Sequence, residues 1–475
     1  MNKALKDILR LFTSNIVTLV LGILSGFIIP KIMGVSDYGM YKTFTLYGAY
    51  LGLFQIGILD GLYLKYGGYD YEHLKKDEFA EYCRSFFLIQ LSISVILLVA
   101  LLFFVSSEYR FILMCLSINL LVVNMTSFFQ VISKMTLRFK LIATRYNIYS
   151  IVLMSSISVL FLFFKIFGRT IPYQLYIGIL LSLNTVLLFW FANTYKEISF
   201  KPNVRPFSNP KFYIEIIKVG MPIMVAYLCS SLILSLDRQF VNILFDIKTY
   251  AVYSFAYSML TLVTTALSAI SSVMYPNLKR MNSETLSKRY SSLVMALMIG
   301  SFGCLFVYFP LVWFVNWYLP LFTGSLGIFR IVLPGIVVSS IVTIVMQNYY
   351  IALEKSFEFF KQTVIVLVLS FIANTIAYWL FRTTYAISAA SVIVTLLWYL
   401  IGERYFVKSF KIKWVKKFTY LLMMMFGFYI ITEFTEWYTG IFIYILFYIV
   451  TTICFWRQNL KQVILMFRER KADLK

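Results

Sequence analysis

Residues 232–257 read LILSLDRQFVNILFDIKTYAVYSFAY, and they place an acid beside a base in a segment apolar enough to cross a membrane. Apolar residues flank Asp237 and Arg238 on both sides, which predicts that both lie within one helix over residues 219–245. A charge at that depth costs free energy unless it faces protein or a water-filled cavity. The pair therefore marks a candidate binding site, and the planar guanidinium of Arg238 suits phosphate or pyrophosphate. The alternative is an ion pair in which Asp237 only neutralises Arg238.

The same stretch resembles the beginning of the chain at an offset of 212 residues. The aligned pairs are Val35 with Ile247, Tyr38 with Tyr250, Gly39 with Ala251, and Tyr41 with Tyr253. This pattern indicates a duplicated architecture in which residues 232–257 belong to the opening of the second copy.

The composition is typical of a polytopic membrane protein. Hydrophobic residues make up 60% of the 475 and charged residues 13%, with a mean hydropathy of +0.81. The net charge of +22 would suggest nucleic acid as the partner of a soluble chain. Here the basic residues gather in short connections between apolar runs, where they set topology and meet anionic lipid headgroups. We therefore expect membrane lipids and no nucleic acid as partners. No metal-ligand spacing or nucleotide-binding motif is present, so no cofactor is expected.

Fourteen apolar runs are long enough to span a membrane, which predicts an all-α fold of about fourteen transmembrane helices. They arrange as two lobes of six helices and an appended pair. Their approximate cores are residues 11–29, 44–64, 86–105, 111–132, 148–164, 172–192, 219–245, 251–274, 293–314, 328–351, 363–381, 385–401, 418–432 and 437–455. The predicted domains are a first lobe over 1–192, a cytoplasmic linker over 193–218, a second lobe over 219–408, and the last two helices with a cytoplasmic tail over 409–475.

The distribution of basic residues supports this topology. With the N-terminus inside, 34 of the 43 Lys and Arg residues fall on the cytoplasmic side of the spans and 9 on the outer side. We therefore expect a multi-pass protein of the cytoplasmic (inner) membrane with both termini cytoplasmic. Six helices per lobe, with both lobes entering from the same side, is an arrangement found in transporters built from parallel repeats.

Five further residues are candidates for lining a cavity. Arg330 lies near the outer end of the tenth span with apolar neighbours on both sides, and we expect it to join Arg238 as a second cation. Lys31 ends the first span, where the alternative is that it reaches the headgroups. Asn15 and Thr18 are polar positions within that span. Asp60, near the inner end of the second span, either titrates during transport or pairs with Lys65, and pairing is the simpler expectation.

Four segments resemble the polysaccharide-transport branch of the MOP superfamily, the flippases of lipid-linked oligosaccharides. They are IIPKIMGVSDYGMYKTF (28–44), GILDGLYLKYGG (57–68), MTLRFKLIATRYN (135–147) and SLDRQFVNILFDIKTYAVYSFAYSM (235–259). The resemblance implies a MOP/MATE-like fold and a substrate of undecaprenyl pyrophosphate carrying a short glycan, such as an O-antigen or capsule repeat unit. It also implies alternating access through a cationic cavity in which Arg238 matches the aspartate–arginine position of the seventh helix. Polysaccharide polymerase machinery is a further expected partner.

One departure bears on the substrate. Related lipid II flippases carry arginine within the first helix, whereas no basic residue lies between Arg10 and Lys31 here, which favours a capsule or O-antigen glycan. Two other functions remain open. A multidrug exporter of the same fold would need acidic residues deep in its cavity. A membrane glycan polymerase or glycosyltransferase would need a sizeable domain or an acidic metal motif, and no catalytic constellation is visible, so the chain is not expected to be an enzyme.

Overall fold

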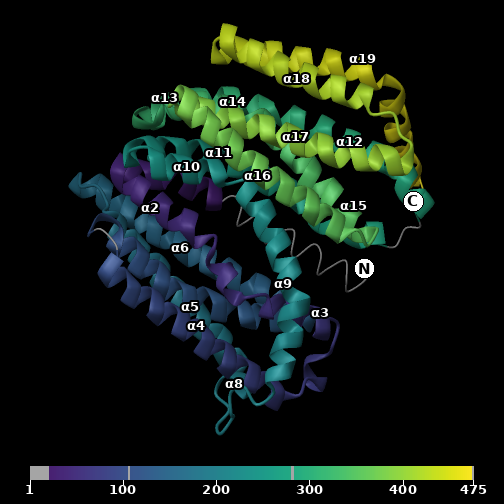
Figure 1. The fold of residues 1–475 in the computed structure, drawn as a ribbon. Helices are drawn as coiled ribbons and strands as arrows, with labels where there is room; N and C mark the ends of the chain where they lie inside the picture. The colour runs from purple at the N-terminus through teal and green to yellow at the C-terminus, as the bar shows by residue number, and fades with distance from the viewer. Residues whose placement is uncertain (1–20, 105–106, 280–282, 473–475) are drawn as a thin grey trace. The chain divides into compact units, whose positions relative to one another are not determined.

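Helices make up every regular element that the computed structural model describes, over residues 21–104, 107–279 and 283–472 (Figure 1). In the first half of the chain they are Leu21–Ile32, α2 (Val35–Gly48), α3 (Ile58–Tyr66), α4 (Lys76–Phe104), α5 (Ser107–Met135), α6 (Phe139–Phe167), α7 (Tyr173–Thr194), α8 (Lys196–Ser199), α9 (Pro210–Ile233), α10 (Leu236–Leu244) and α11 (Ile247–Lys279). In the second half they are α12 (Ser283–Cys304), α13 (Tyr308–Tyr318), α14 (Ser325–Ser340), α15 (Gln347–Ala352), α16 (Ser356–Phe381), α17 (Thr384–Phe410), α18 (Val415–Phe434) and α19 (Trp437–Ala472).

The predicted all-α polytopic fold is confirmed. Eleven helices among the described residues are long and apolar enough to span a membrane. The other three predicted spans correspond to the helix Leu21–Ile32, to α2 with α3, and to part of α11. Each predicted span therefore has a helical counterpart.

The chain forms two compact units, which we call unit 1 (Met1–Phe255) and unit 2 (Ala256–Lys475). The boundary falls inside α11, so α9 and α10 pack with the helices that precede them. The predicted domains over 1–192, 193–218, 219–408 and 409–475 describe the sequence repeat, and that division stays a prediction.

The 212-residue offset also holds for local structure. One helix ends at Ile32 and α2 begins at Val35, while α10 ends at Leu244 and α11 begins at Ile247. Both pairs of helix ends are separated by the offset found in the sequence. The repeat therefore reproduces the same interruption of a helix at the same position.

Two predicted spans are broken rather than continuous. In the second span, α2 and α3 are separated by a 3₁₀ turn (Leu51–Gln55) and by Gly57, which has a φ of 71°. Amide side chains satisfy the backbone carbonyls opened by this break: Asn124 Nδ2 donates to Leu51 O at 3.0 Å and Gln90 Nε2 donates to Phe54 O at 2.8 Å. Irregular backbone at membrane depth is tolerated where protein supplies such partners.

Backbone contact between α3 and α9 requires a glycine at position 220. A Cβ on Gly220 would lie 1.9 Å from Gly57 O and 2.6 Å from Gly61 N, which are backbone atoms that cannot rotate away. Small residues at such crossings let two helices approach closely.

We expect Gly220→Ala to destabilise unit 1, because the added methyl group must push α3 away from α9. Overpacking of this kind costs roughly 1–3 kcal/mol. Thermal unfolding of the purified protein in detergent would measure the loss. Gly178→Ala in α7 is the matched control, because nothing lies within 4 Å of its added Cβ; equal melting temperatures for the two variants would contradict the packing argument.

Tyrosines attach α18 and α19 to the rest of unit 2. Tyr429 Oη donates to Ile331 O at 2.8 Å, and Tyr444 Oη donates to Phe302 O at 2.6 Å. A third bond, from Tyr448 Oη to Ile299 O, measures 3.0 Å. The appended pair of helices is therefore an integral layer of unit 2.

Candidate substrate-binding site

Asp237 and Arg238 lie where the seventh predicted span is interrupted. The prediction of one continuous helix over 219–245 is wrong, because α9 ends at Ile233 and α10 begins at Leu236. Asp237 Oδ1 accepts from the Arg238 backbone N at 2.8 Å, and Arg238 Nη2 donates to Leu234 O at 3.1 Å. Short side chains such as Ser and Asp compete with helical backbone bonds in this way.

The order of the two charges matches the two helix ends. Asp237 occupies the first turn of α10, where the helix dipole favours an anion. Arg238 reaches back to a carbonyl at the end of α9, where the dipole favours a cation. The acid–base pair therefore stabilises the interruption, which is a structural role that the sequence alone does not reveal.

A tyrosine of α11 donates a hydrogen bond to the buried carboxylate of Asp237. Asp237 is 1% exposed, and Tyr253 Oη donates to its Oδ2 at 2.8 Å. Together with the Arg238 backbone N–H, this gives each carboxylate oxygen a donor. A buried charge is tolerable when it is hydrogen-bonded in this way.

Lys42 joins this site, although it is not among the site residues predicted from the sequence. Lys42 lies on α2, with its Nζ 5.3 Å from the ring centroid of Tyr38 and 5.4 Å from that of Tyr41. It lies within Coulombic range of Arg238. Residue 42 falls between the predicted spans 11–29 and 44–64, although the 212-residue offset aligns it with the first turns of the predicted span 251–274.

Polar contacts hold α10 against α2 and fix the two cations relative to each other. Asn242 Nδ2 donates to Thr43 Oγ1 at 2.8 Å, and Tyr50 Oη lies 2.5 Å from Ser235 Oγ. Gln239 Nε2 also donates to the Tyr50 hydroxyl. Along the chain these bonds follow Lys42 and lie on both sides of Arg238, so they hold the segments that carry the two cations together as a frame.

Aromatic side chains surround this frame within unit 1. The rings of Tyr41 and Tyr176 meet edge to face at 5.0 Å, and the ring of Phe27 lies 6.1 Å from that of Phe255. Tyr176 and Phe255 are buried, at 1% and 0% exposure, so these aromatic contacts pack unit 1 around the frame.

Comparison with known proteins gives matches among solved structures only: no family model and no curated protein matches the sequence. A lipid II flippase, MurJ, in an inward-closed conformation matches with a TM-score of 0.68 at 16% identity, over 96% of this chain and 100% of that one. An inward-facing multidrug resistance MATE family transporter of the MOP superfamily matches with a TM-score of 0.58 at 13% identity, over 83% of this chain and 95% of that one. The chain therefore has a MOP/MATE-like fold, as predicted.

A third similar structure has a binding pocket of reverse polarity. It is a MOP superfamily transporter from Pyrococcus furiosus with a TM-score of 0.50 at 13% identity, over 86% of this chain and 97% of that one. The reverse polarity of that protein's binding pocket suggests a different function for it. Identities this low establish the shared fold, so the predicted polysaccharide-transport branch stays a prediction.

Arg330 lies in unit 2 of this MOP fold, whereas Arg238 packs within unit 1. Arg330 Nη1 forms an ion pair with Glu433 Oε2 of α18 at 2.5 Å. Its predicted role as a second substrate cation stays a prediction. The ion pair shows that Arg330 already has a partner within its own unit.

The remaining candidates have separate surroundings. Lys31 is partly buried in the helix Leu21–Ile32, and Asp60 is partly buried on α3. The expected pairing of Asp60 with Lys65 is not found: among the described residues no ion pair joins them, and the Lys65 ammonium lies 4.3 Å from the ring centroid of Phe212. Asn15 and Thr18 lie outside the described residues.

Proposed function

We propose that the protein is a flippase that moves an oligosaccharide linked to a polyprenyl pyrophosphate from the cytoplasmic to the outer leaflet by alternating access. The observation that carries the proposal is the cation pair of Lys42 and Arg238 within one unit of a MOP fold. Two cations held together by such a frame repel each other, and a bound anion relieves that repulsion. A pyrophosphate supplies such an anion, and its several oxygens can accept from both side chains.

The physical task explains why a cavity is needed. A charged pyrophosphate and many sugar hydroxyls lose their water in hydrocarbon, at a cost on the order of tens of kcal/mol for the charge alone. Lys42 and Arg238 replace part of that solvation. The polyprenyl tail stays in lipid throughout. A carrier of O-antigen or capsule units would then supply the polysaccharide polymerase machinery on the outer side.

The alternative is a multidrug exporter on the same fold, which the match to a MATE family transporter favours. A cationic drug would be repelled by Lys42 and Arg238, and the carboxylate of Asp237 is buried and hydrogen-bonded. An anionic or neutral drug would not meet that repulsion, so an experiment has to separate the two functions.

Deletion of the gene is expected to stop export of the surface glycan and to leave its lipid-linked precursor exposed on the cytoplasmic leaflet. The measurement is the fraction of lipid-linked glycan that an impermeant glycan-modifying enzyme reaches in intact spheroplasts and in inverted vesicles. Drug susceptibility of the same strain should not change. Raised drug susceptibility with normal glycan export would favour the exporter, and formation of glycosidic bonds by the purified protein would contradict both transport functions.

A further inference from the structure

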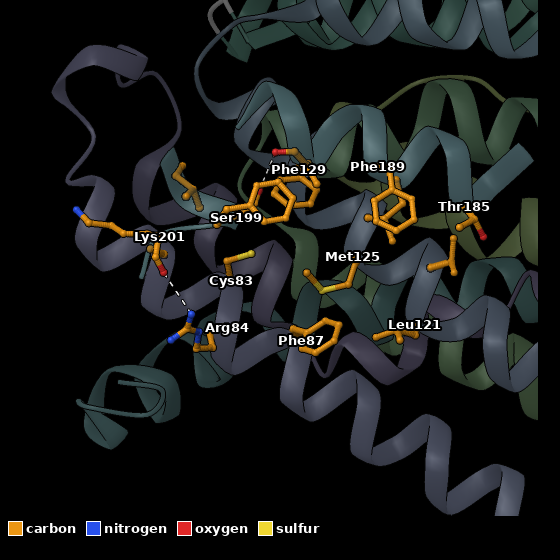
Figure 2. Close-up of a pocket in the computed structure, with 16 residues that line it drawn as sticks. Cys83, Arg84, Phe87, Leu121, Met125, Phe129, Thr185, Phe189, Ser199 and Lys201 are labelled. Carbon is orange, nitrogen blue, oxygen red and sulfur yellow. Dashed lines mark hydrogen bonds between the residues drawn. The ribbon is translucent and has the colours of Figure 1, made fainter. Parts of the chain in front are cut away.

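A groove of about 500 Å³ in unit 1 lies apart from the cation pair, between α4, α5, α7 and the connection that contains α8. Figure 2 shows its apolar wall, to which Phe87, Leu121, Met125 and Phe189 contribute. Apolar residues recur on each helix at intervals of three or four, so each helix presents one continuous apolar stripe to the groove. A pocket of this volume can hold a small ligand or one lipid chain.

The groove is polar at one end only. Arg84 and Lys201 lie together at that end, and the view in Figure 2 shows them on the opposite side from Leu121 and Thr185. The Arg84 side chain is exposed, and it donates to Val204 O at 2.6 Å and to Lys201 O at 3.2 Å. Among the described residues no carboxylate forms an ion pair with Arg84, so its charge meets only backbone carbonyls.

Lys201 is the second cation at this end. Its Nζ forms an ion pair with Asp77, whose side chain is 81% exposed. An exposed pair of this kind contributes little and rearranges at low cost. Arg84 and Lys201 can therefore both turn toward an anion at the mouth of the groove.

The predicted topology places this polar end at the inner leaflet. Residues 193–218 form the connection that the basic-residue distribution predicts to be cytoplasmic, and Lys201 belongs to it. The apolar part of the groove extends from there along spanning helices. A cationic mouth followed by an apolar channel is complementary to an anionic headgroup joined to an acyl chain.

We infer that the groove binds an anionic glycerophospholipid of the inner leaflet, with one acyl chain between α4, α5 and α7 and the phosphate at Arg84 and Lys201. A bound lipid would hold the connection of residues 193–209 against α4. Two residues of α4 already contact this connection: Arg84 donates to its backbone carbonyls, and Glu81 accepts from Ser208 N at 2.8 Å. The occupant is a diacyl lipid rather than a polyprenyl chain, because a long polyprenyl chain would leave most of its length outside a groove of this size.

The experiment measures lipids that remain bound to the purified full-length protein. The protein is reconstituted in nanodiscs containing phosphatidylglycerol and phosphatidylcholine at equal mole fractions, released, and weighed by native mass spectrometry. We expect phosphatidylglycerol adducts to predominate on the wild type. Arg84→Gln should weaken that binding about fivefold, which is typical for one basic residue at a lipid surface. Leu121→Trp should also reduce it, because the indole fills the apolar channel.

Two matched variants separate the groove from general effects. Arg169→Gln removes an exposed arginine from the connection between α6 and α7, which the predicted topology places on the outer side. Val186→Trp adds the same indole to a position of α7 that is 63% exposed. Both should bind phosphatidylglycerol as the wild type does. Equal binding of the two lipids, or an equal loss in the groove variants and their controls, overturns the inference. Displacement of phosphatidylglycerol by equimolar undecaprenyl phosphate also overturns it, because the groove would then be a site for the polyprenyl chain.

Discussion

Replacing Arg238 with alanine is expected to reduce export of the lipid-linked glycan strongly while the protein still inserts into the membrane. The guanidinium lies within Coulombic range of Lys42 and can present two parallel N–H groups to a pyrophosphate. Hydrogen bonds to charged groups contribute roughly 1.5–3 kcal/mol each, so the loss of one cation should reduce transport roughly 10- to 100-fold. Flipping of a defined undecaprenyl-pyrophosphate glycan in proteoliposomes gives the rate directly.

Three comparisons distinguish substrate binding from folding. Lys42→Ala should impair transport to a similar degree, because it removes the other cation. Arg238→Lys should recover part of the rate, because it keeps the charge and loses the planar fork. Lys248→Gln changes an exposed lysine in the first turn of α11, so this variant should transport normally. Transport that survives both Arg238→Ala and Lys42→Ala would refute the cation-pair proposal even if the protein proves to be a flippase.

The overall fold could be predicted from the sequence because it depends on long apolar runs. Each predicted span has a helical counterpart, and the 212-residue repeat reappears as equal positions of helix ends. The length of an apolar run and the number of basic residues around it are averages over many positions, so single errors have little effect.

The helix interruptions could not be predicted, because each depends on one or two side chains. Nothing in the apolar run over 219–245 distinguishes a continuous helix from α9 and α10; the break depends on Asp237 bonding to backbone and on Arg238 reaching Leu234 O. The break between α2 and α3 is also local: it depends on the positive φ angles of Ile56 and Gly57, which end the 3₁₀ turn before α3. A hydropathy profile cannot register such contacts.

The candidate site was only partly accessible from the sequence. Asp237 and Arg238 were detectable, because charges inside an apolar run are rare. Lys42 was not, because it lies close to the predicted end of a span, where lysine is ordinary. Proximity of Lys42 to Arg238 depends on packing between segments almost 200 residues apart, and one sequence carries no signal for that.

A buried ion pair in unit 2 was hidden for the same reason. Lys417 counts as one of many basic residues in a cytoplasmic connection, yet its side chain and that of Glu403 are each 2% exposed. Lys417 Nζ lies 2.6 Å from Glu403 Oε1, and Tyr290 Oη donates to Glu403 Oε2 at 2.6 Å. The three residues come from α12, α17 and α18, so the cluster joins an appended helix to the lobe.

Lys417→Met is expected to destabilise unit 2 strongly, because it leaves the Glu403 carboxylate buried with a tyrosine hydroxyl in place of a full counter-charge. Breaking a buried pair from one side costs about 3–5 kcal/mol. Thermal unfolding in detergent, with the amount of monodisperse protein recovered, measures the loss.

Lys416→Met is the matched control, since the Lys416 ammonium lies 4.7 Å from the ring centroid of Trp456 and its side chain is exposed; that contact is worth only about 0.5–1 kcal/mol. Adding Glu403→Gln to Lys417→Met removes both charges and should restore much of the stability. If the single and double variants unfold at the same temperature, the Glu403 carboxylate is not the source of the cost, and the ion pair does not hold α18 to the lobe.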